Sequence, residues 1–221
     1  MARARRCAGK CGARSRPRSN TWSLKTMRIV AGEFRGRTLC TPRGAATRPT
    51  AARAREALFS ILRDLSAEKV LDLYAGSGAL GLEALSRGAE RLVLVESSKA
   101  AQQAIRSNLQ ALDVGARATL VPLRAEASFK ALERLGPFSL VFADPPWADA
   151  QAALDVLEKL VGHSLLTPAA RLVLEHAARM PPLSSLGSRL NPVDTRRWGD
   201  TAVTLFEVIE ASGLAPNSSS S

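Results

Sequence analysis

Residues 70–81 read Val-Leu-Asp-Leu-Tyr-Ala-Gly-Ser-Gly-Ala-Leu-Gly, which joins a short apolar run to a G-x-G-x-x-G pattern. The run predicts a buried strand, and the pattern predicts a glycine-rich turn that opens a helix. Glycines let the backbone approach a ligand closely, and a helix N-terminus presents unpaired N–H groups to it. The next expected strand ends at Glu96, 20 residues after Gly76, where a carboxylate can accept hydrogen bonds from ribose hydroxyls. The stretch therefore predicts the nucleotide-binding edge of an α/β sheet.

Short apolar runs alternate with helical patterns along the rest of the chain. Such alternation favours a parallel sheet that is covered by helices on both faces. Residues 202–209 follow a stretch without a long helix, so a terminal hairpin with an antiparallel strand is expected. Before the sheet, residues 28–32 and 37–39 predict two short strands, and a helix is expected from Thr50. The other expected strands are 70–73, 91–95, 118–122, 140–143 and 171–175, with helices at 79–87, 97–112, 128–135 and 150–161.

A second motif, Asp144-Pro145-Pro146-Trp147, directly follows the apolar run 138–143. Proline has no N–H, so this turn offers carboxylate and carbonyl acceptors to an exocyclic amino group without a competing donor. Trp147 adds a face on which a base can stack. The ends of parallel strands share one edge of a sheet, which places the motif beside Gly76. The alternative is a strand that ends in a rigid turn with a packing tryptophan.

Two features favour S-adenosylmethionine over a dinucleotide as the ligand of the glycine loop. Asp72 stands just before the loop, where its carboxylate can meet an ammonium group, whereas a pyrophosphate would gain nothing from it. The amine-binding motif is expected on the same edge, next to the reactive end of the cofactor. A dehydrogenase interpretation rests on the glycines alone and leaves residues 144–147 unexplained.

The composition fits one domain with added segments. The chain has 221 residues, of which 46% are hydrophobic, and contains no apolar run as long as the ~18 residues of a membrane span. The net charge is +11, and residues 1–26 carry eight basic residues and no acid. We expect this segment to be a disordered basic extension suited to nucleic acid, and residues 212–221 to be a disordered tail. A transit peptide and translation from an upstream start are alternative origins of the extension.

Cysteine and histidine are too scarce for metal or triad chemistry. Cys7 and Cys11 are spaced C-x3-C without a second pair that would complete a zinc site, and Cys40 stands alone. The sequence has two histidines. We therefore expect no metal site and no disulfide framework, and a reducing cytoplasm fits this composition.

With these residues in view, the chain resembles the RsmD family, bacterial methyltransferases that modify one guanine of small-subunit (16S) ribosomal RNA at N2. The resemblance covers about residues 27–210. It implies a Rossmann-like class I S-adenosylmethionine-dependent methyltransferase domain over 27–211, with a mostly parallel seven-stranded sheet whose last strand is antiparallel. The matching segments are 28–32 with 35–37, 48–50 leading into 53–59, 72–88, 144–147 and 197–201.

The resemblance also assigns roles to residues of this chain. Residues 27–66 would form an N-terminal β-hairpin and helix that grip RNA, with Arg28, Arg35, Arg37, Arg48, Thr50 and Arg53 at the interface, and Arg55 as a further candidate. The catalytic residues would be Asp144, Pro145, Pro146 and Trp147. The cofactor would be S-adenosylmethionine, bound by Asp72, Tyr74, Ala75, Gly76, Ser77, Gly78, Gly81, Glu96, Ala125, Glu126 and Asp144.

Two positions depart from the family pattern. Trp147 stands where phenylalanine or tyrosine is commoner, which keeps a stacking face but makes the pocket bulkier. The sequence Arg124-Ala125-Glu126-Ala127 stands where the family has asparagine or aspartate followed by alanine, and Glu126 is the candidate substitute for the adenine contact.

The expected substrate is small-subunit ribosomal RNA or a 30S assembly intermediate, acted on by a monomer. One alternative is a DNA adenine-N6 or other nucleic-acid amino-methyltransferase, which would use the same cofactor and tetrapeptide. Another is a non-catalytic RNA-binding assembly factor that keeps the fold as a platform.

Overall fold

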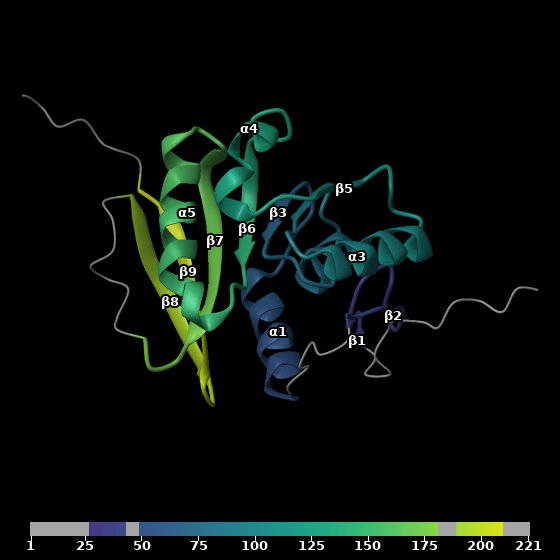
Figure 1. The fold of residues 1–221 in the computed structure, drawn as a ribbon. Coiled ribbons are helices and arrows are strands. Elements are labelled where there is room, and N and C mark those ends of the chain that lie inside the picture. Colours follow the sequence, from purple (N-terminus) through teal and green to yellow (C-terminus); the bar gives the residue numbers. More distant parts are fainter. Residues whose placement is uncertain (1–26, 43–48, 181–188, 210–221) are drawn as a thin grey trace, which may run out of the picture.

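The computed structural model describes residues 27–42, 49–180 and 189–209, and for residues 49–53 it describes the backbone alone (Figure 1). The predicted extension over 1–26 and tail over 212–221 lie outside the described residues. Both therefore stay predictions, as does the boundary of the domain at residue 211.

One sheet of seven strands comprises β3 (Lys69–Leu73), β4 (Arg91–Val95), β5 (Ala118–Val121), β6 (Phe138–Ala143), β7 (Leu166–Ala177), β8 (Leu190–Trp198) and β9 (Thr201–Val208). Their order in space is β5-β4-β3-β6-β7-β9-β8. The strands from β3 to β7 are parallel, while β9 is antiparallel to both of its neighbours. The predicted mostly parallel sheet with an antiparallel last strand is confirmed.

Helices cover both faces of this sheet, as predicted. The first face carries α1 (Pro49–Leu62), α2 (Ala79–Ser86) and α3 (Lys99–Leu112), and the second carries α4 (Phe129–Leu132) and α5 (Ala150–Gly162). Neighbouring residues of a strand point to opposite faces, so Val70 and Leu71 are both fully buried but enter different cores. This explains why the strands read as continuous apolar runs rather than alternating ones.

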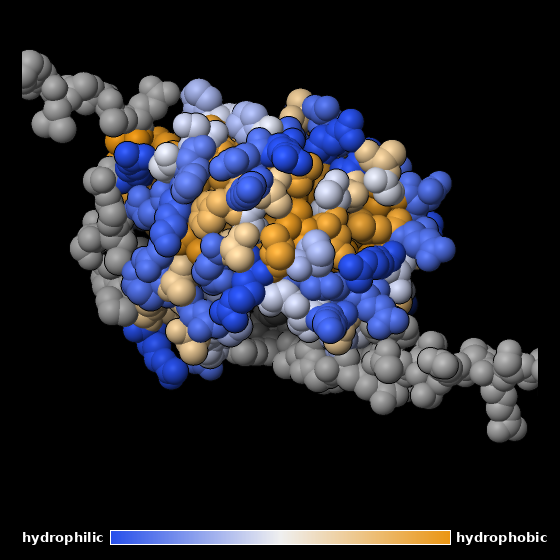
Figure 2. Space-filling view, turned by 45° about the horizontal axis from the view of Figure 1, so that its top comes forward, coloured by the Kyte–Doolittle hydropathy of each residue, from blue (hydrophilic) through white to orange (hydrophobic). Residues whose placement is uncertain are grey.

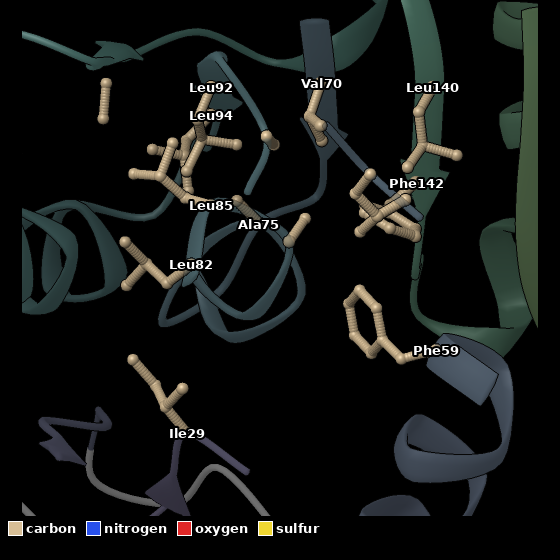
Figure 3. Packing of buried hydrophobic residues seen from close by; sticks show 14 of the residues in the cluster. Ile29, Phe59, Val70, Ala75, Leu82, Leu85, Leu92, Leu94, Leu140 and Phe142 are labelled. Carbon is tan, nitrogen blue, oxygen red and sulfur yellow. The ribbon is translucent and has the colours of Figure 1, made fainter. Parts of the chain in front are cut away.

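The core on the first face includes residues from the N-terminal segment (Figure 3). Phe59 of α1 meets Phe142 of β6 edge to face, with ring centroids 5.8 Å apart. Ile29 is 2% exposed and belongs to the same cluster as Leu82 of α2. Residues before the sheet are therefore part of the fold and not an appendage.

Figure 2 shows the surface after the molecule is turned so that the top of Figure 1 comes forward. In this view, hydrophilic residues border a central hydrophobic area.

The helix predicted over residues 128–135 is wrong in its extent. The structure has a 3-10 turn, η1 (Ala125–Ala127), followed by the short α4. The carbonyl of Leu132 accepts the N–H groups of both Leu135 and Gly136, which closes the helix before the apolar pattern ends. A pattern of apolar residues does not record such a turn, so the sequence overestimated the helix.

The N-terminal hairpin is confirmed, but its strands are shorter than predicted. β1 (Met27–Arg28) pairs antiparallel with β2 (Thr38–Leu39) over two residues. Beyond β1 the backbone N–H groups of Val30 and Ala31 donate to the Glu83 carboxylate of α2, at 2.7 and 3.1 Å. Because these groups bond a side chain, they do not extend the ladder.

Ser86 at the end of α2 holds the tip of the same segment. Its hydroxyl donates to the Ala31 carbonyl at 2.6 Å and accepts the Phe34 N–H at 2.9 Å, while its own carbonyl accepts the Glu33 N–H at 2.7 Å. Glu83 and Ser86 are 1% and 3% exposed. Buried polar side chains of α2 therefore fix the hairpin on the first face of the sheet.

The turn of the hairpin offers a matched pair of glycine substitutions. Gly32 and Gly36 both have left-handed backbone, with φ of 82° and 81°. A Cβ on Gly32 would lie 1.8 Å from the Ser86 carbonyl oxygen, whereas a Cβ on Gly36 would meet nothing within 4 Å. We expect Gly36→Ala to lower the free energy of unfolding by about 1–2 kcal/mol, the strain of a left-handed alanine. Gly32→Ala should cost at least a further 1–3 kcal/mol, roughly the range for overpacking.

Urea unfolding followed by circular dichroism measures both changes. Equal losses at the two positions would mean that the hairpin does not pack against α2 as closely as the structure shows.

Candidate active site

The glycine loop turns the chain sharply between β3 and α2. Tyr74, Gly76 and Gly78 all have positive φ, of 58°, 57° and 79°. The Ala75 N–H donates to the Val95 carbonyl at 3.1 Å, and the Gly78 N–H donates to the Ala75 carbonyl at 2.7 Å. Left-handed backbone is costly for a residue with a side chain, and such conformations gather at functional sites.

The three glycines of the motif serve different purposes. A Cβ on Gly78 would lie 2.9 Å from a methyl carbon of Leu94, and one on Gly81 would lie 2.5 Å from a methyl carbon of Leu92. These two glycines allow α2 to pack closely on β4. A Cβ on Gly76 would come no nearer than 4.0 Å to any atom, the Tyr74 carbonyl oxygen. Gly76 is therefore the glycine that borders open space, where a ligand can approach the backbone.

Glu96 follows β4 and ties two loops together. Its Oε2 accepts the Gly76 N–H and its Oε1 accepts the Ser98 N–H, both at 2.7 Å. The residue is 8% exposed, and its carbonyl accepts from the Gln102 amide at 2.9 Å. Each carboxylate oxygen has a second lone pair, so the anchored group can still accept from a ligand hydroxyl.

Asp72 lies beneath the loop and is 1% exposed. Its Oδ2 accepts the N–H of Gly81, in the first turn of α2, at 2.9 Å. Burial raises the pKa of this carboxyl well above its ordinary value, the Gly81 N–H opposes the shift, and the charges of Asp144 and Glu96 add to it. The observed contact is with the protein backbone, and the contact of Asp72 with a cofactor ammonium stays a prediction.

A cleft of about 800 Å³ opens at the carboxyl ends of β3, β4, β5 and β6. It brings together predicted residues from all four strand ends, and it adds residues that sequence patterns did not single out. The signal for most of those was their place within three residues of a strand end, whereas Asp149 lies six residues beyond β6 and had no such signal. The lining residues predicted from the sequence are Tyr74, Glu96, Ala125, Glu126, Asp144, Pro145 and Pro146, and the added ones are Val95, Ser97, Ser98, Leu123, Arg124 and Asp149.

The charge of this cleft is strongly negative. Four carboxylates line it, from Glu96, Glu126, Asp144 and Asp149, against the guanidinium of Arg124. Such a lining favours a ligand that carries positive charge.

Tyr74 and Glu126 connect the walls of the cleft. The Tyr74 hydroxyl donates to Glu126 Oε1 at 3.2 Å, and Arg124 Nε lies 3.4 Å from Glu126 Oε2. Burial and then the charge of Glu126 raise the pKa of Tyr74. The pKa of Glu126 is lowered chiefly by a hydrogen bond from its own backbone N–H; burial opposes this as the next largest effect, and Tyr74 and Arg124 lower the pKa further. Glu126 is thus held ionised at the position where the family pattern differs.

The Asp-Pro-Pro-Trp motif forms a turn at the end of β6. Asp144 is exposed and Pro145 is buried. The Pro146 carbonyl accepts the Asp149 N–H at 2.7 Å, which fixes the 3-10 turn η2 (Trp147–Asp149). Trp147 is half-buried and is not among the described residues that line the cleft. Its role as a stacking face stays a prediction.

The predicted RNA-binding residues are described only in part. Arg28, Arg35 and Arg37 are exposed on the hairpin, and Arg37 also donates to the Ala111 carbonyl of α3 at 2.5 Å. Arg48 lies outside the described residues, and for Thr50 and Arg53 only the helical backbone is described.

Arg55 differs from these residues because it is only partly exposed. It donates to the Arg28 carbonyl at 3.0 Å. Burial lowers its pKa, while the charge of Glu83 opposes this effect and that of Arg87 adds to it. Its observed contact joins α1 to β1, which is a structural role that the sequence pattern did not indicate.

Metal ligands do not cluster in the described part of the chain. Within it, no group of three histidine, cysteine, aspartate or glutamate side chains could hold a metal ion. Within the same residues, no helix is long and apolar enough to cross a membrane.

Solved structures show which class of protein has this fold. A structure described as "Putative methyltransferase yhhF from Escherichia coli" aligns with a TM-score of 0.69 and 31% identity, over 83% of this chain and 98% of that chain. A more distant one, "SMU.776, a putative methyltransferase complexed with SAH", aligns with a TM-score of 0.60 and 16% identity, over 77% of this chain and 53% of that chain. The fold is therefore that of the S-adenosylmethionine-dependent methyltransferases.

Sequence comparison narrows the class to a family. The family model "Conserved hypothetical protein 95" matches residues 27–207, and the chain belongs to this family. "Putative rRNA methyltransferase YlbH" of Bacillus subtilis is 32% identical over 82% of this chain and 98% of its own length. "Ribosomal RNA small subunit methyltransferase D" of Escherichia coli is 43% identical over 55% of this chain and 60% of its own length. The resemblance to RsmD enzymes is confirmed at the level of this family of rRNA methyltransferases.

The buried carboxyl of Asp72 makes a testable contribution to stability. Its pKa in the folded protein is raised, so the folded state binds a proton more tightly than the unfolded state does. The stability that this proton provides is complete below the ordinary pKa of 3.8 and is lost as the pH rises through the folded value. We expect Asp72→Asn, which keeps an acceptor for the Gly81 N–H, to gain stability relative to the wild type as the pH rises from about 4 to 8.

Urea unfolding across this pH range measures the difference. Asp64→Asn is the matched control, for which the stability difference from the wild type should change with pH in the opposite direction. The Ser66 N–H lowers the pKa of Asp64, so the stability that the Asp64 carboxylate contributes is lost as the pH falls. A constant difference between wild type and Asp72→Asn across the range would show that the carboxyl is not protonated on folding.

Proposed function

We propose that this protein transfers a methyl group from S-adenosylmethionine to the N2 amino group of a guanine in small-subunit ribosomal RNA. The observation that carries the proposal is the meeting, in one cleft, of the anchored Glu96 carboxylate and the Asp144-Pro145-Pro146 turn. The Glu96 carboxylate is suited to hold a ribose, and the turn is suited to hold a flat amino group.

The cleft fits the cofactor by its shape and charge. Gly76 leaves open space above the loop backbone, and Glu96 keeps free lone pairs for the two ribose hydroxyls. Glu126 is positioned by Tyr74 and Arg124 to accept from the adenine amino group. The excess of carboxylates suits a ligand with a positive sulfonium and a positive ammonium group.

The main contribution of the protein to this reaction is to position the reacting groups. Bound S-adenosylmethionine supplies a methyl group that is activated by its sulfonium sulfur. The amino group of guanine is a weak nucleophile because its lone pair is delocalised into the ring. Asp144 and the Pro145 carbonyl would accept hydrogen bonds from the two N–H groups of this amino group. These contacts would direct the nitrogen lone pair toward the methyl carbon. When the amino nitrogen accepts the methyl group, Asp144 would take the proton that this nitrogen loses.

The hairpin supports the choice of RNA as the substrate. Arg28, Arg35 and Arg37 are exposed on it, and the hairpin packs on α2, the helix that follows the glycine loop. Guanidinium groups bind phosphates, and such contacts position a nucleic acid without reading its sequence. The two relatives that are named as rRNA methyltransferases favour ribosomal RNA over DNA.

The first test is methyl transfer from labelled S-adenosylmethionine to unmethylated small ribosomal subunits. Wild-type protein should place label in guanine. Asp144→Ala should reduce turnover by about 10²–10³-fold or more, because it removes an acceptor from the reacting amino group. Asp155→Asn, which changes an exposed carboxylate on α5 outside the cleft, should retain wild-type turnover. Full turnover by Asp144→Ala would exclude this residue from the reaction.

The same assay with duplex DNA separates the alternatives. Label in adenine of DNA, with none in the subunits, would establish the DNA amino-methyltransferase. Cofactor binding without transfer to RNA or DNA would indicate a binding factor that lacks the chemistry.

The hairpin contact is tested by a charge reversal at Arg35. Arg35→Glu should weaken binding to small-subunit RNA at every sequence tested and reduce the slope of log K against log salt by about 1, because one phosphate contact is lost. Lys159→Glu is the control, since Lys159 is exposed on α5, which covers the other face of the sheet. A fall of the same size in both variants would mean that only net charge matters.

A further inference from the structure

Asn108 of α3 joins the N-terminal hairpin directly to the glycine loop. Its Oδ1 accepts the Cys40 N–H at 2.7 Å, and its Nδ2 donates to the Cys40 carbonyl at 3.0 Å and to the Ser77 carbonyl at 2.9 Å. Cys40 directly follows β2, and Ser77 stands between the first two glycines of the motif. One side chain therefore bridges two segments that are 37 residues apart in the chain.

The chemistry of this bridge makes it rigid. A primary amide offers one acceptor oxygen and two N–H donors in a fixed plane, and here the oxygen and the nitrogen are both engaged. Asn108 is 1% exposed, so water does not replace a contact that is broken. If Ser77 moved relative to Cys40, at least one buried polar group would lose its partner, which is unfavourable.

One end of the bridge lies next to the cleft, and the other lies next to the paired strands of the hairpin. Ser77 follows Gly76, the residue that borders open space beside the cleft. Cys40 follows the strand that pairs with Met27 and Arg28, and its neighbour Leu39 is 2% exposed in the core. The hydroxyl of Ser77 also approaches the sulfur of Met27 at 4.0 Å, so both strands of the hairpin lie close to the loop.

We propose that Asn108 is a positioning residue that couples the cofactor site to the RNA-binding hairpin. Ordering of the glycine loop by the cofactor is transmitted through the amide to the backbone at Cys40, and RNA bound to the hairpin orders the loop in return. This inference rests on the proposed function, because it takes the hairpin as an RNA contact. Coupling of this kind is reciprocal, so each ligand must raise the affinity for the other by the same factor.

The test measures this factor in both directions. The Kd for unmethylated small-subunit ribosomal RNA is measured with and without saturating S-adenosylhomocysteine, which cannot react, and the Kd for S-adenosylhomocysteine is measured with and without RNA. We expect the wild type to show a factor of about five or more, equal in the two directions. In Asn108→Ala the factor should fall to about 1, even where both ligands still bind.

Gln102→Ala is the matched control. Gln102 is a second buried amide on α3, but its Nε2 donates to the carbonyls of Glu96 and Ser97, on the cofactor side alone. It should keep the coupling factor of the wild type, whatever it does to the cofactor Kd. Thermal unfolding shows whether each variant is folded at the temperature of the binding measurements.

A measurement on wild-type protein without RNA tests the link even if Asn108→Ala fails to fold. Hydrogen exchange of the Cys40 amide should slow about fivefold or more when S-adenosylhomocysteine binds, because its acceptor is the Asn108 oxygen. The Lys69 amide is the internal control, since it also donates to a side chain, that of Ser139. Lys69 is the first residue of β3, at the amino end of the strand, whereas the cleft lies at the carboxyl ends. Its exchange should not change.

Each outcome decides a separate point. Coupling that persists in Asn108→Ala would overturn the role of Asn108, and absence of coupling in a wild type that binds both ligands would overturn the proposal as a whole. RNA that does not bind at all would contradict the proposed function instead. Exchange at Cys40 would then decide whether the loop and the hairpin are linked.

Discussion

The position of the N-terminal segment depends on hydrogen bonds from buried side chains to its backbone. β1 and β2 pair over two residues each, too few to hold a hairpin in water. Backbone N–H groups that this short ladder leaves unpaired donate instead to side chains of Glu83 and Ser86 of α2 and of Asn108 of α3. Both helices follow loops whose residues line the cleft. The segment that carries the exposed arginines is therefore placed by the same elements that shape the cleft.

Sequence patterns predicted the parts of the molecule that repeat with a short period or occupy a fixed place in the sheet. Parallel strands end at a common edge, so the strand runs and the glycine loop were enough to predict that Glu96 and Asp144 share one cleft. The patterns did not show that Gly78 and Gly81 serve packing, or that Arg55 bonds the backbone of β1, because these contacts depend on residues far away in the chain. Asn108 carried no local signal, since its partners precede it by 68 and 31 residues.

The structure places the two kinds of charge that the proposed ligands require in different parts of the molecule. Carboxylates outnumber basic groups in the cleft by four to one, which favours a cationic ligand over a phosphate, while the hairpin carries three exposed guanidiniums, those of Arg28, Arg35 and Arg37. In the proposed function, the hairpin holds the polyanionic backbone of the substrate, and an uncharged base enters the cleft with little electrostatic repulsion.

The terminal β-hairpin has a consequence for how copies of the chain meet. Among the described strands, the outermost ones of the sheet are β5, with four residues, and β8, and an outer strand can pair with a strand of another chain. β8 contains Pro192, which lacks an N–H, and its register shifts between Pro192 and Asp194. Exposed Arg196 and Arg197 follow. Within the described residues, one edge is thus short and the other irregular and charged, and both features disfavour edge-to-edge pairing with another sheet.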